Sequence, residues 1–438
     1  MFRNKNIYLD YASATPIDKS VARKMALYEC NFFTNSSAIH QEGVKVRNVI
    51  EESRNKIAKL INAHNDEIIF TGSGTESIAL ALLGLIKNYE LRIKNENSEF
   101  EYKKPHIITT KIEHPAVLEN CKMLEESGEA EVTYISVDKS GIVNLEELKD
   151  SLKENTVLVS VMYANNEIGT VQPIQEIAKI IRHFKKNYLT PALSKGEGAP
   201  SPLGKAGDGV FPVFHTDACQ AMNYLYTENI EKLGVDLMSF NSSKIYGPKG
   251  IGVLYKKRGV KLSPLYAGGG QEFGLHSGTE SVSLIAGLAE AFSITNKIKQ
   301  KESERLTKIR DYGIKKLLSL SGVSGYKIIL NGDKTNRLPN NINISVLGIS
   351  SELLVIELSA RGIFVSEKSA CKSDDHNKSY VIDAIRKICL KDGSEVGGSL
   401  RISLGRANKM SDMDILYRGL KNILKKYKQW TPLEVDRP

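Results

Sequence analysis

Residues 210–250 read VFPVFHTDACQAMNYLYTENIEKLGVDLMSFNSSKIYGPKG, and they contain a carboxylate and a lysine that look like two ends of one site. Asp217 ends a run, PVFHTD, whose pattern is typical of a buried strand. Lys244 follows a second apolar run, LMSF, and precedes glycine and proline residues that predict a tight turn. A lysine held at a strand end can be desolvated, which lowers its pKa and makes a nucleophilic amine available for a Schiff base.

A Schiff-base lysine and an acidic partner for a ring nitrogen are what pyridoxal 5'-phosphate (PLP) requires. The two residues do not decide the matter alone, because the chain has 60 lysines and arginines and such residues are mostly solvated surface charges. Asp217 could equally cap the end of its strand. The wider pattern, TDACQA followed by LMSF and SKIYGPKGIGVLY, closely resembles the cysteine desulfurases, a branch of the class-V aminotransferase group of PLP enzymes.

The resemblance implies an α/β protein with the PLP-dependent transferase fold of type I. A large α/β domain with a mixed, mostly parallel sheet is expected over residues 15–295. A smaller α+β domain is expected to combine residues 1–14 with 296–438 and to carry the catalytic cysteine loop. Residues 190–211 are rich in glycine and proline, which predicts a flexible insertion after a helix from Ile174 to Lys186. The charge-rich residues 87–104 are expected to form a surface connection.

Several strand ends supply candidate cofactor contacts. The segment TGSGTES opens an apolar helix, whose first turn offers backbone N–H groups to a phosphate. Such glycine turns are common, but the resemblance to the family's GATES assigns the phosphate cradle to Gly74 and Thr75. His114, in TKIEH, matches a family histidine that stacks on the PLP ring and moves protons. The resemblance assigns the remaining cofactor contacts to Asn166, Asp217, Gln220, Asn241, Ser243, Lys244 and Thr279.

Three of these positions depart from the family pattern or imply a second subunit. The family usually has a histidine before the lysine, as in SGHK, whereas this chain has Ser243 there and Asn241 two residues earlier. Both can hydrogen-bond to phosphate, but serine lacks an aromatic ring and a possible positive charge, so we expect PLP to be held more weakly. In the family, the threonine at position Thr279 contacts the phosphate of the neighbouring subunit, which implies a homodimer. His276 stands where an arginine is frequent, and no role is assigned to it.

The substrate residues follow from three further matches. Arg401, in GSLRISLGR, has a guanidinium fork that suits a carboxylate, although an arginine here could also be a plain salt-bridge partner. The match to R-x-S-L-G-R favours binding of the carboxylate of L-cysteine, with Asn166 and Asn35 as further substrate contacts. Cys371 lies in a polar stretch, EKSACKSDDHNKS, and is the expected nucleophile toward the substrate sulfur. The resulting persulfide would pass to a sulfur-acceptor protein, either an iron–sulfur scaffold or a tRNA-thiolation relay.

The composition of the chain argues against several other classes of protein. Of the 438 residues, 41% are hydrophobic and 25% charged, as in an ordinary globular protein. The five cysteines are an odd number without a CxxC pair, so neither a disulfide framework nor a metal site is indicated. The net charge of +9 is spread along the chain, and we expect no direct nucleic-acid binding. No apolar run approaches the ~18 residues of a membrane span and no signal peptide is visible, which predicts a cytoplasmic protein.

Two other functions remain open. A selenocysteine lyase or another class-V transferase would share every cofactor residue, and only the cysteine loop separates them from a desulfurase. A non-catalytic sulfur-relay or scaffold subunit with a decayed site would explain the departure at Asn241 and Ser243. The presence of Lys244, Asp217 and Cys371 argues against decay.

Overall fold

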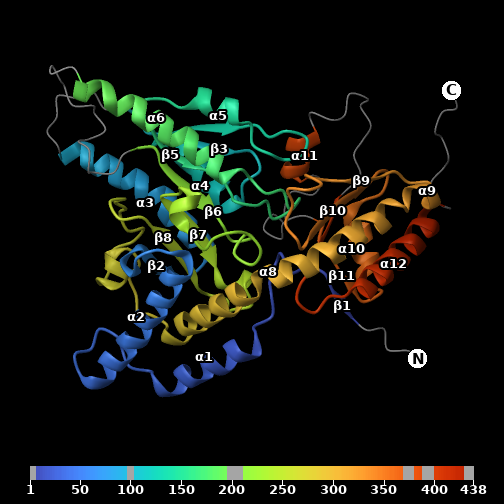
Figure 1. Cartoon of the computed structure of the whole chain (residues 1–438), viewed down its shortest axis with the longest axis horizontal. Helices are drawn as coiled ribbons and strands as arrows, with labels where there is room; N and C mark the ends of the chain where they lie inside the picture. The colour runs from blue at the N-terminus through green and yellow to red at the C-terminus, as the bar shows by residue number, and fades with distance from the viewer. Residues whose placement is uncertain (1–5, 96–102, 195–210, 368–378, 387–398, 429–438) are drawn as a thin grey trace.

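A computed structural model describes residues 6–95, 103–194, 211–367, 379–386 and 399–428. Figure 1 shows two lobes, one built on a large sheet and the other on β9, β10, α10 and α12, with the long helix α8 (Val282–Leu318) running from one lobe to the other. The expected α/β architecture is confirmed. No helix within the described ranges is long and apolar enough to cross a bilayer.

The larger lobe contains a seven-stranded sheet in the order β2-β8-β7-β6-β5-β3-β4. Strand β8 is antiparallel to both neighbours, and the other pairs are parallel, as the sequence predicted. Most of the strands are buried along their whole length, which fits continuous apolar runs covered by helices on both faces. In chain order, the strands are β2 (Ile68–Thr71), β3 (His106–Thr110), β4 (Glu131–Ile135), β5 (Thr156–Ser160), β6 (Val213–Asp217), β7 (Leu237–Asn241) and β8 (Gly252–Lys256).

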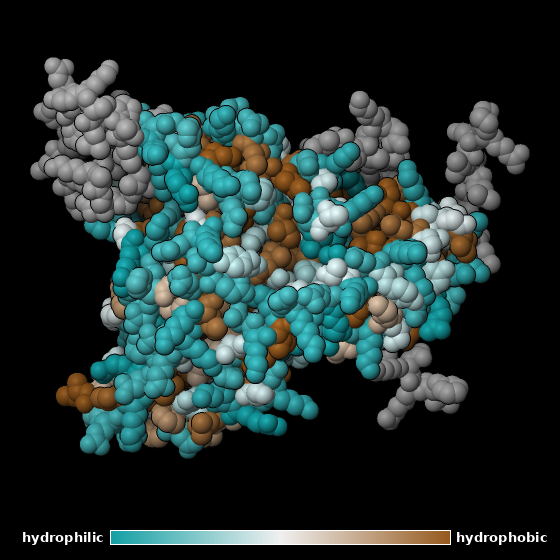
Figure 2. Space-filling view, in the orientation of Figure 1, coloured by the Kyte–Doolittle hydropathy of each residue, from teal (hydrophilic) through white to brown (hydrophobic). Residues whose placement is uncertain are grey.

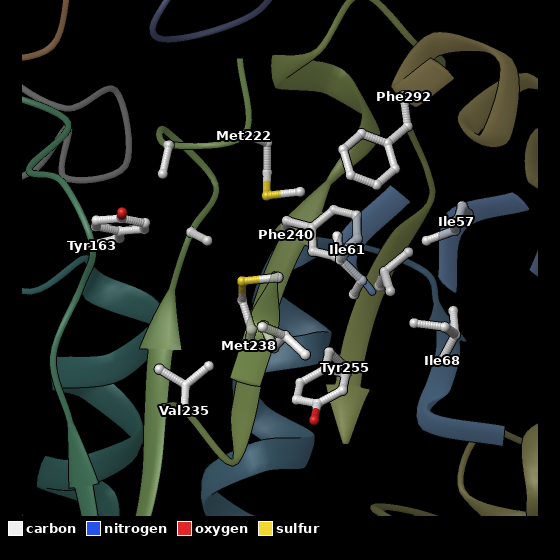
Figure 3. Close-up of a cluster of buried hydrophobic side chains, with 14 of the residues drawn as sticks. Ile57, Ile61, Ile68, Tyr163, Met222, Val235, Met238, Phe240, Tyr255 and Phe292 are labelled. Atoms are coloured by element: carbon white, nitrogen blue, oxygen red, sulfur yellow. The ribbon is translucent and has the colours of Figure 1, made fainter. Parts of the chain in front are cut away.

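Helices cover both faces of this sheet, and successive strand residues alternate between two apolar cores. Met238 packs into the core with α2 and α8, whereas the preceding Leu237 packs into the core with α3 and α4. Figure 3 shows the first core, in which the rings of Phe240 and Phe292 lie 5.5 Å apart. The helices are α1 (Lys19–Asn31), α2 (Gln41–Ile61), α3 (Gly74–Asn95), α4 (Pro115–Glu126), α5 (Leu145–Ser151), α6 (Ile174–Ser194) and α7 (Ile230–Leu233).

The smaller lobe is built from the C-terminal residues and the start of the chain. Strand β1 pairs in parallel with β11, and β12, β10 and β9 form an antiparallel sheet in that order. Ile7 and Leu9 share one apolar core with residues from Leu306 to Leu424. The elements are β1 (Ile7–Tyr8), α9 (Ser321–Ser324), β9 (Ile328–Leu330), β10 (Asn341–Val346), α10 (Ser351–Ser359), β11 (Ile363–Phe364), α11 (Tyr380–Arg386), β12 (Ser399–Ser403) and α12 (Met410–Lys428). The boundary at residue 295 stays a prediction, since α8 runs through it.

Two expectations about connections are partly wrong. Residues 87–95 belong to helix α3, because the buried Tyr89 continues the apolar face and contacts Phe211 at a ring distance of 5.6 Å. Helix α6 continues past Lys186 to Ser194, so the expected insertion begins within a helix. The rest of the expected insertion, residues 195–210, lies outside the described residues.

Candidate active site

Lys244 ends the 3-10 helix η2 (Ser242–Lys244), which follows β7 directly. Its Nζ donates to the carbonyl oxygen of Ala12 at 2.9 Å and to that of Ser13. The carbonyl oxygen of Lys244 accepts a hydrogen bond from the side-chain amide of Asn223. The amine is therefore held against the segment that follows β1, close to the start of the chain.

Asp217 and His114 lie at the carboxyl ends of two strands of the large sheet. Asp217 ends β6, is buried, and accepts a hydrogen bond from the backbone N–H of Cys219 at 2.9 Å. His114 caps α4, and its Nδ1 accepts from the backbone N–H of Ala116 at 3.1 Å. Burial lowers the pKa of His114. The nearby Asp217 raises this pKa, whereas Lys244 lowers it further. The three groups are thus close enough to influence one another's charge.

The N-terminus of α3 lies beside the end of β7. A Cβ atom on Gly74 would be 2.9 Å from Asn241 Nδ2 and 3.0 Å from Cys219 Sγ, so a larger residue there would have to displace the Asn241 side chain. The side chain of Thr75 is exposed, and Ser243 Oγ donates to Asn241 Oδ1 at 3.4 Å. The first-turn amides of a helix have no acceptor within the helix. The structure therefore brings Gly74, Thr75, Asn241 and Ser243 together around an anion-attracting helix start.

A second polar group lies next to the lysine. Arg401, on β12, is only 2% exposed, and its Nη1 donates to the carbonyl oxygen of Asn166 at 3.2 Å. Its Nη2 donates to Asp10 Oδ1 at 2.9 Å and to Ser13 Oγ at 2.6 Å. Among the described residues, Arg401 Nε and Asn166 Oδ1 are buried without a hydrogen-bond partner. Gln220 Nε2 donates at 3.0 Å to the carbonyl oxygen of Ala12, which also accepts from Lys244 Nζ.

Three predicted residues are not joined to this cluster. Thr279 is exposed on the loop before α8. Asn35 is exposed on the connection between α1 and α2, where its side chain accepts from the N–H of Ser37 at 2.8 Å. Cys371 lies outside the described residues. No contact recorded for the described residues joins Asn35 to Arg401.

His276, which had no predicted role, pairs with the first turn of α3. Its Nε2 lies 3.1 Å from Glu76 Oε1, and this hydrogen bond is the main cause that raises the pKa of His276. The other oxygen of Glu76 accepts from the backbone N–H of Gly72 at 2.7 Å. The same pairing lowers the pKa of Glu76. A hydrogen-bonded histidine–carboxylate pair therefore lies beside the proposed phosphate cradle.

Glu113, which lies next to His114, is a further residue of the site that the sequence did not predict. Glu113 Oε1 accepts from Thr110 Oγ1 at 2.7 Å and from the N–H of Met162 at 3.0 Å. Its Oε2 is buried without a partner among the described residues. Burial raises the pKa of Glu113 to about 8, with a smaller contribution from Asp217. The only sign of this role in the sequence is that Glu113 is a charged residue after an apolar strand. Many surface residues share that pattern, so the pattern does not identify a site residue.

The residues present fit PLP. A primary amine, a carboxylate and an imidazole lie near one another at strand ends, and a helix start with a bare glycine lies beside them. The unpartnered Oδ1 of Asn166 is an acceptor that has no protein donor among the described residues. No group of three or more histidine, cysteine, aspartate or glutamate side chains in the described ranges could hold a metal ion.

Comparison with known proteins agrees with this geometry. The Aminotransferase class-V family model matches residues 7–190 and 208–416. Cysteine desulfurase IscS of Dictyoglomus turgidum is 39% identical over 432 residues, which cover 99% of this chain and 98% of the relative. A solved NifS-like protein has a TM-score of 0.80 at 31% identity, covering 96% of this chain and all (100%) of its own.

A second solved structure, SspA in complex with cysteine, has a TM-score of 0.70 at 30% identity and covers 91% of this chain and 99% of its own. These neighbours confirm the expected fold type, and the family they represent depends on PLP. The chain belongs to the class-V aminotransferase family, on the branch formed by the cysteine desulfurases.

Proposed function

We propose that the chain is a PLP-dependent cysteine desulfurase, which converts L-cysteine to L-alanine and takes up the sulfur as a persulfide on Cys371. The observation that supports this best is the position of Arg401 beside Lys244, since Ser13 contacts both. An amine that can hold PLP and a guanidinium that can hold an amino-acid carboxylate thus lie within reach of one small ligand.

Each part of the cofactor has candidate partners in the chain. Lys244 would hold PLP through its amine, and Asp217 would pair with the ring nitrogen. His114 would stack on the ring, and Gln220 would donate to the phenolic oxygen. The phosphate would be bound by Gly74, Thr75, Asn241, Ser243 and, from the neighbouring subunit, Thr279. When bound, PLP supplies an electron sink that lowers the cost of removing the Cα proton of the substrate.

The residues of the chain would bind the substrate and move its protons. Arg401 would bind the carboxylate of L-cysteine with its unpartnered Nε, and Asn166 and Asn35 would add contacts. Lys244 would take the proton from Cα as a general base. The lowered pKa of His114 keeps its imidazole neutral near pH 7, so that it can accept a proton as well.

Sulfur transfer would use the thiolate of Cys371. The thiolate attacks the substrate sulfur, so an S–S bond forms and the Cβ–S bond breaks. The bonding electron pair stays with the substrate carbon, which is then protonated to give alanine. Residues on both sides of the stretch 368–378 lie at the site: Ser366 pairs with Arg401, and the Tyr380 hydroxyl donates to the carbonyl oxygen of Glu113 at 2.6 Å.

A second copy of the chain is the proposed partner in a homodimer. Phe33 and Ile39, on the connection between α1 and α2, are 84% and 95% exposed. Figure 2 shows brown, hydrophobic atoms projecting at the end of the larger lobe where Figure 1 places this connection. Exposed apolar residues of this size favour a protein interface.

A cytoplasmic location, and delivery of sulfur to an iron–sulfur scaffold or a tRNA-thiolation relay, are also proposals.

Incubation of the purified protein with L-cysteine tests the function. We expect sulfide, released in the presence of a thiol reductant, and alanine in equal amounts. Lys244→Ala should lose the visible absorbance of bound PLP while keeping its circular dichroism spectrum. Cys371→Ser should keep that absorbance but release no sulfide and accept no persulfide label. Sulfide release from Cys371→Ser would favour a lyase or another class-V transferase, and absence of alanine from the unaltered protein would favour a non-catalytic relay.

A further inference from the structure

Residues 10–15, here called the N-terminal segment, run between the lysine and the arginine of the site. The carbonyl oxygen of Ala12 accepts from Lys244 Nζ at 2.9 Å and from Gln220 Nε2 at 3.0 Å. Ser13 accepts from Lys244 with its carbonyl oxygen and from Arg401 Nη2 with its hydroxyl. The segment therefore contacts residues from both lobes at the point where cofactor and substrate are expected to meet.

Both ends of the N-terminal segment are fixed by the fold. At its start, Asp10 pairs with Ser403 of β12, and the N–H of Ala12 donates to Ser403 Oγ at 2.9 Å. At its end, Thr15 Oγ1 donates to the carbonyl oxygen of Ser243 at 2.9 Å and accepts from the N–H of Tyr246 at 2.8 Å. Because the N-terminal segment is held at both ends, Ser13 has little freedom to move away from Arg401.

Three acceptors set the orientation of the Arg401 guanidinium. The carbonyl oxygen of Asn166 accepts from Nη1, while Asp10 and Ser13 accept from Nη2. The Nε atom is buried and has no partner among the described residues. A planar guanidinium that is held at two of its nitrogens presents the third at a fixed angle.

Asp10 and Ser13 differ in charge, and this difference separates their roles. Asp10 is an anion and so competes with a substrate carboxylate for the positive charge of Arg401. Ser13 is neutral and holds the same nitrogen at 2.6 Å without such competition. The serine can therefore keep the guanidinium in place both before and after a carboxylate binds.

We propose that Ser13 is a positioning residue for substrate binding, whose hydroxyl orients Arg401 toward the carboxylate of the amino-acid substrate. Its carbonyl oxygen holds the amine of Lys244 on the other side, so that one residue sets the spacing between the two groups. The inference rests on the proposed function, because it takes the ligand of Arg401 to be that carboxylate. Removal of the hydroxyl leaves the carbonyl in place, and so separates the two roles.

Steady-state kinetics of the holoenzyme test this with a matched pair of variants. Ser13→Ala should raise KM for L-cysteine about tenfold, the usual effect of losing one hydrogen bond to a charged group, and should change kcat little. Ser13→Thr keeps a hydroxyl and should restore most of the affinity. L-cysteine methyl ester has no carboxylate, so its KM should be the same for all three proteins. An equal rise in KM for the acid and the ester, or no rise for either, would overturn the inference.

A binding measurement keeps this test independent of turnover. The holoenzyme is titrated by calorimetry with 3-mercaptopropionate, which has a carboxylate and a thiol but no amine. We expect the unaltered protein to bind it about tenfold more tightly than Ser13→Ala. Equal affinities would refute the role of Ser13 and leave the proposed function intact. Failure of the unaltered protein to bind L-cysteine in any assay would overturn the proposed function and this inference together.

Discussion

Replacement of Glu113 by glutamine should stabilise the protein at neutral pH. The carboxyl group is buried, its Oε2 has no partner among the described residues, and burial raises its pKa from 4.5 to about 8. The Oε1 atom accepts two hydrogen bonds, from Thr110 and Met162, which a glutamine carbonyl oxygen can accept in the same way. The substitution thus removes the ionisable group and preserves its hydrogen bonds.

The sign and size of the effect follow from the two pKa values of Glu113. The folded state binds the proton more tightly, so the favourable contribution to the free energy of unfolding is complete below the unfolded pKa of 4.5 and is lost as pH rises toward 8. At about 1.4 kcal/mol per pH unit, the loss is about 3 kcal/mol at pH 7 and about 1 kcal/mol at pH 5. Glu113→Gln avoids this loss, so its advantage over the unaltered chain should grow by about 2 kcal/mol between these pH values.

Urea unfolding followed by circular dichroism at pH 5 and pH 7 measures the difference. The matched control is Glu129→Gln, which removes an exposed carboxyl group and should shift the unfolding midpoint little at either pH. If the gain in stability of Glu113→Gln over the unaltered protein were the same at both pH values, the pKa of Glu113 would be the same in the folded and unfolded states. The reasoning from burial would then be refuted.

Three further substitutions test the site. Ser243→His adds an aromatic ring and a possible charge beside the phosphate, and should lower the PLP dissociation constant about fivefold by spectroscopic titration, whereas equal or weaker binding would show that another group compensates. Gly74→Ala places a Cβ 2.9 Å from Asn241 Nδ2, so it should weaken PLP binding about tenfold in the same titration; unchanged binding would mean that Asn241 moves freely. Arg401→Lys replaces a fork by a point charge and should raise KM for L-cysteine about tenfold with unchanged PLP absorbance; an unchanged KM would remove the carboxylate role.

Much of the site could be predicted because its residues follow strands with clear patterns. Asp217 ends the buried strand β6, and His114 lies in the short connection between the buried strand β3 and α4. The carboxyl ends of parallel strands meet at one edge of a sheet. The sequence TGSGTES predicts a glycine turn at the start of α3, and Gly74 of this turn lies beside Asn241. In these cases a local pattern and a general rule of sheet topology together fix the position of a side chain.

The contacts of the N-terminal segment could not be predicted in this way. Lys244 is held by carbonyl oxygens of Ala12 and Ser13, which every residue type possesses, so no sequence letter reports them. The contact of Ser13 with Arg401 joins residues 388 positions apart, through the pairing of β1 with β11 and of Asp10 with Ser403. Such long-range contacts depend on how the two lobes share the ends of the chain, which periodicity cannot show.

The replacement of the family histidine by Ser243 acquires a clearer meaning from the neighbouring pair formed by Glu76 and His276. Glu76 lies in the first turn of α3, where its negative charge would oppose a phosphate bound at the same helix start. His276 Nε2 lies 3.1 Å from Glu76 Oε1, and this hydrogen bond raises the pKa of His276, so a protonated His276 would offset the negative charge of Glu76. Under the proposed function, Ser243 lacks the possible charge of a histidine, and the charge of a protonated His276 would be directed at Glu76. Phosphate binding would then depend mainly on the backbone amides of α3 and on neutral donors such as Asn241.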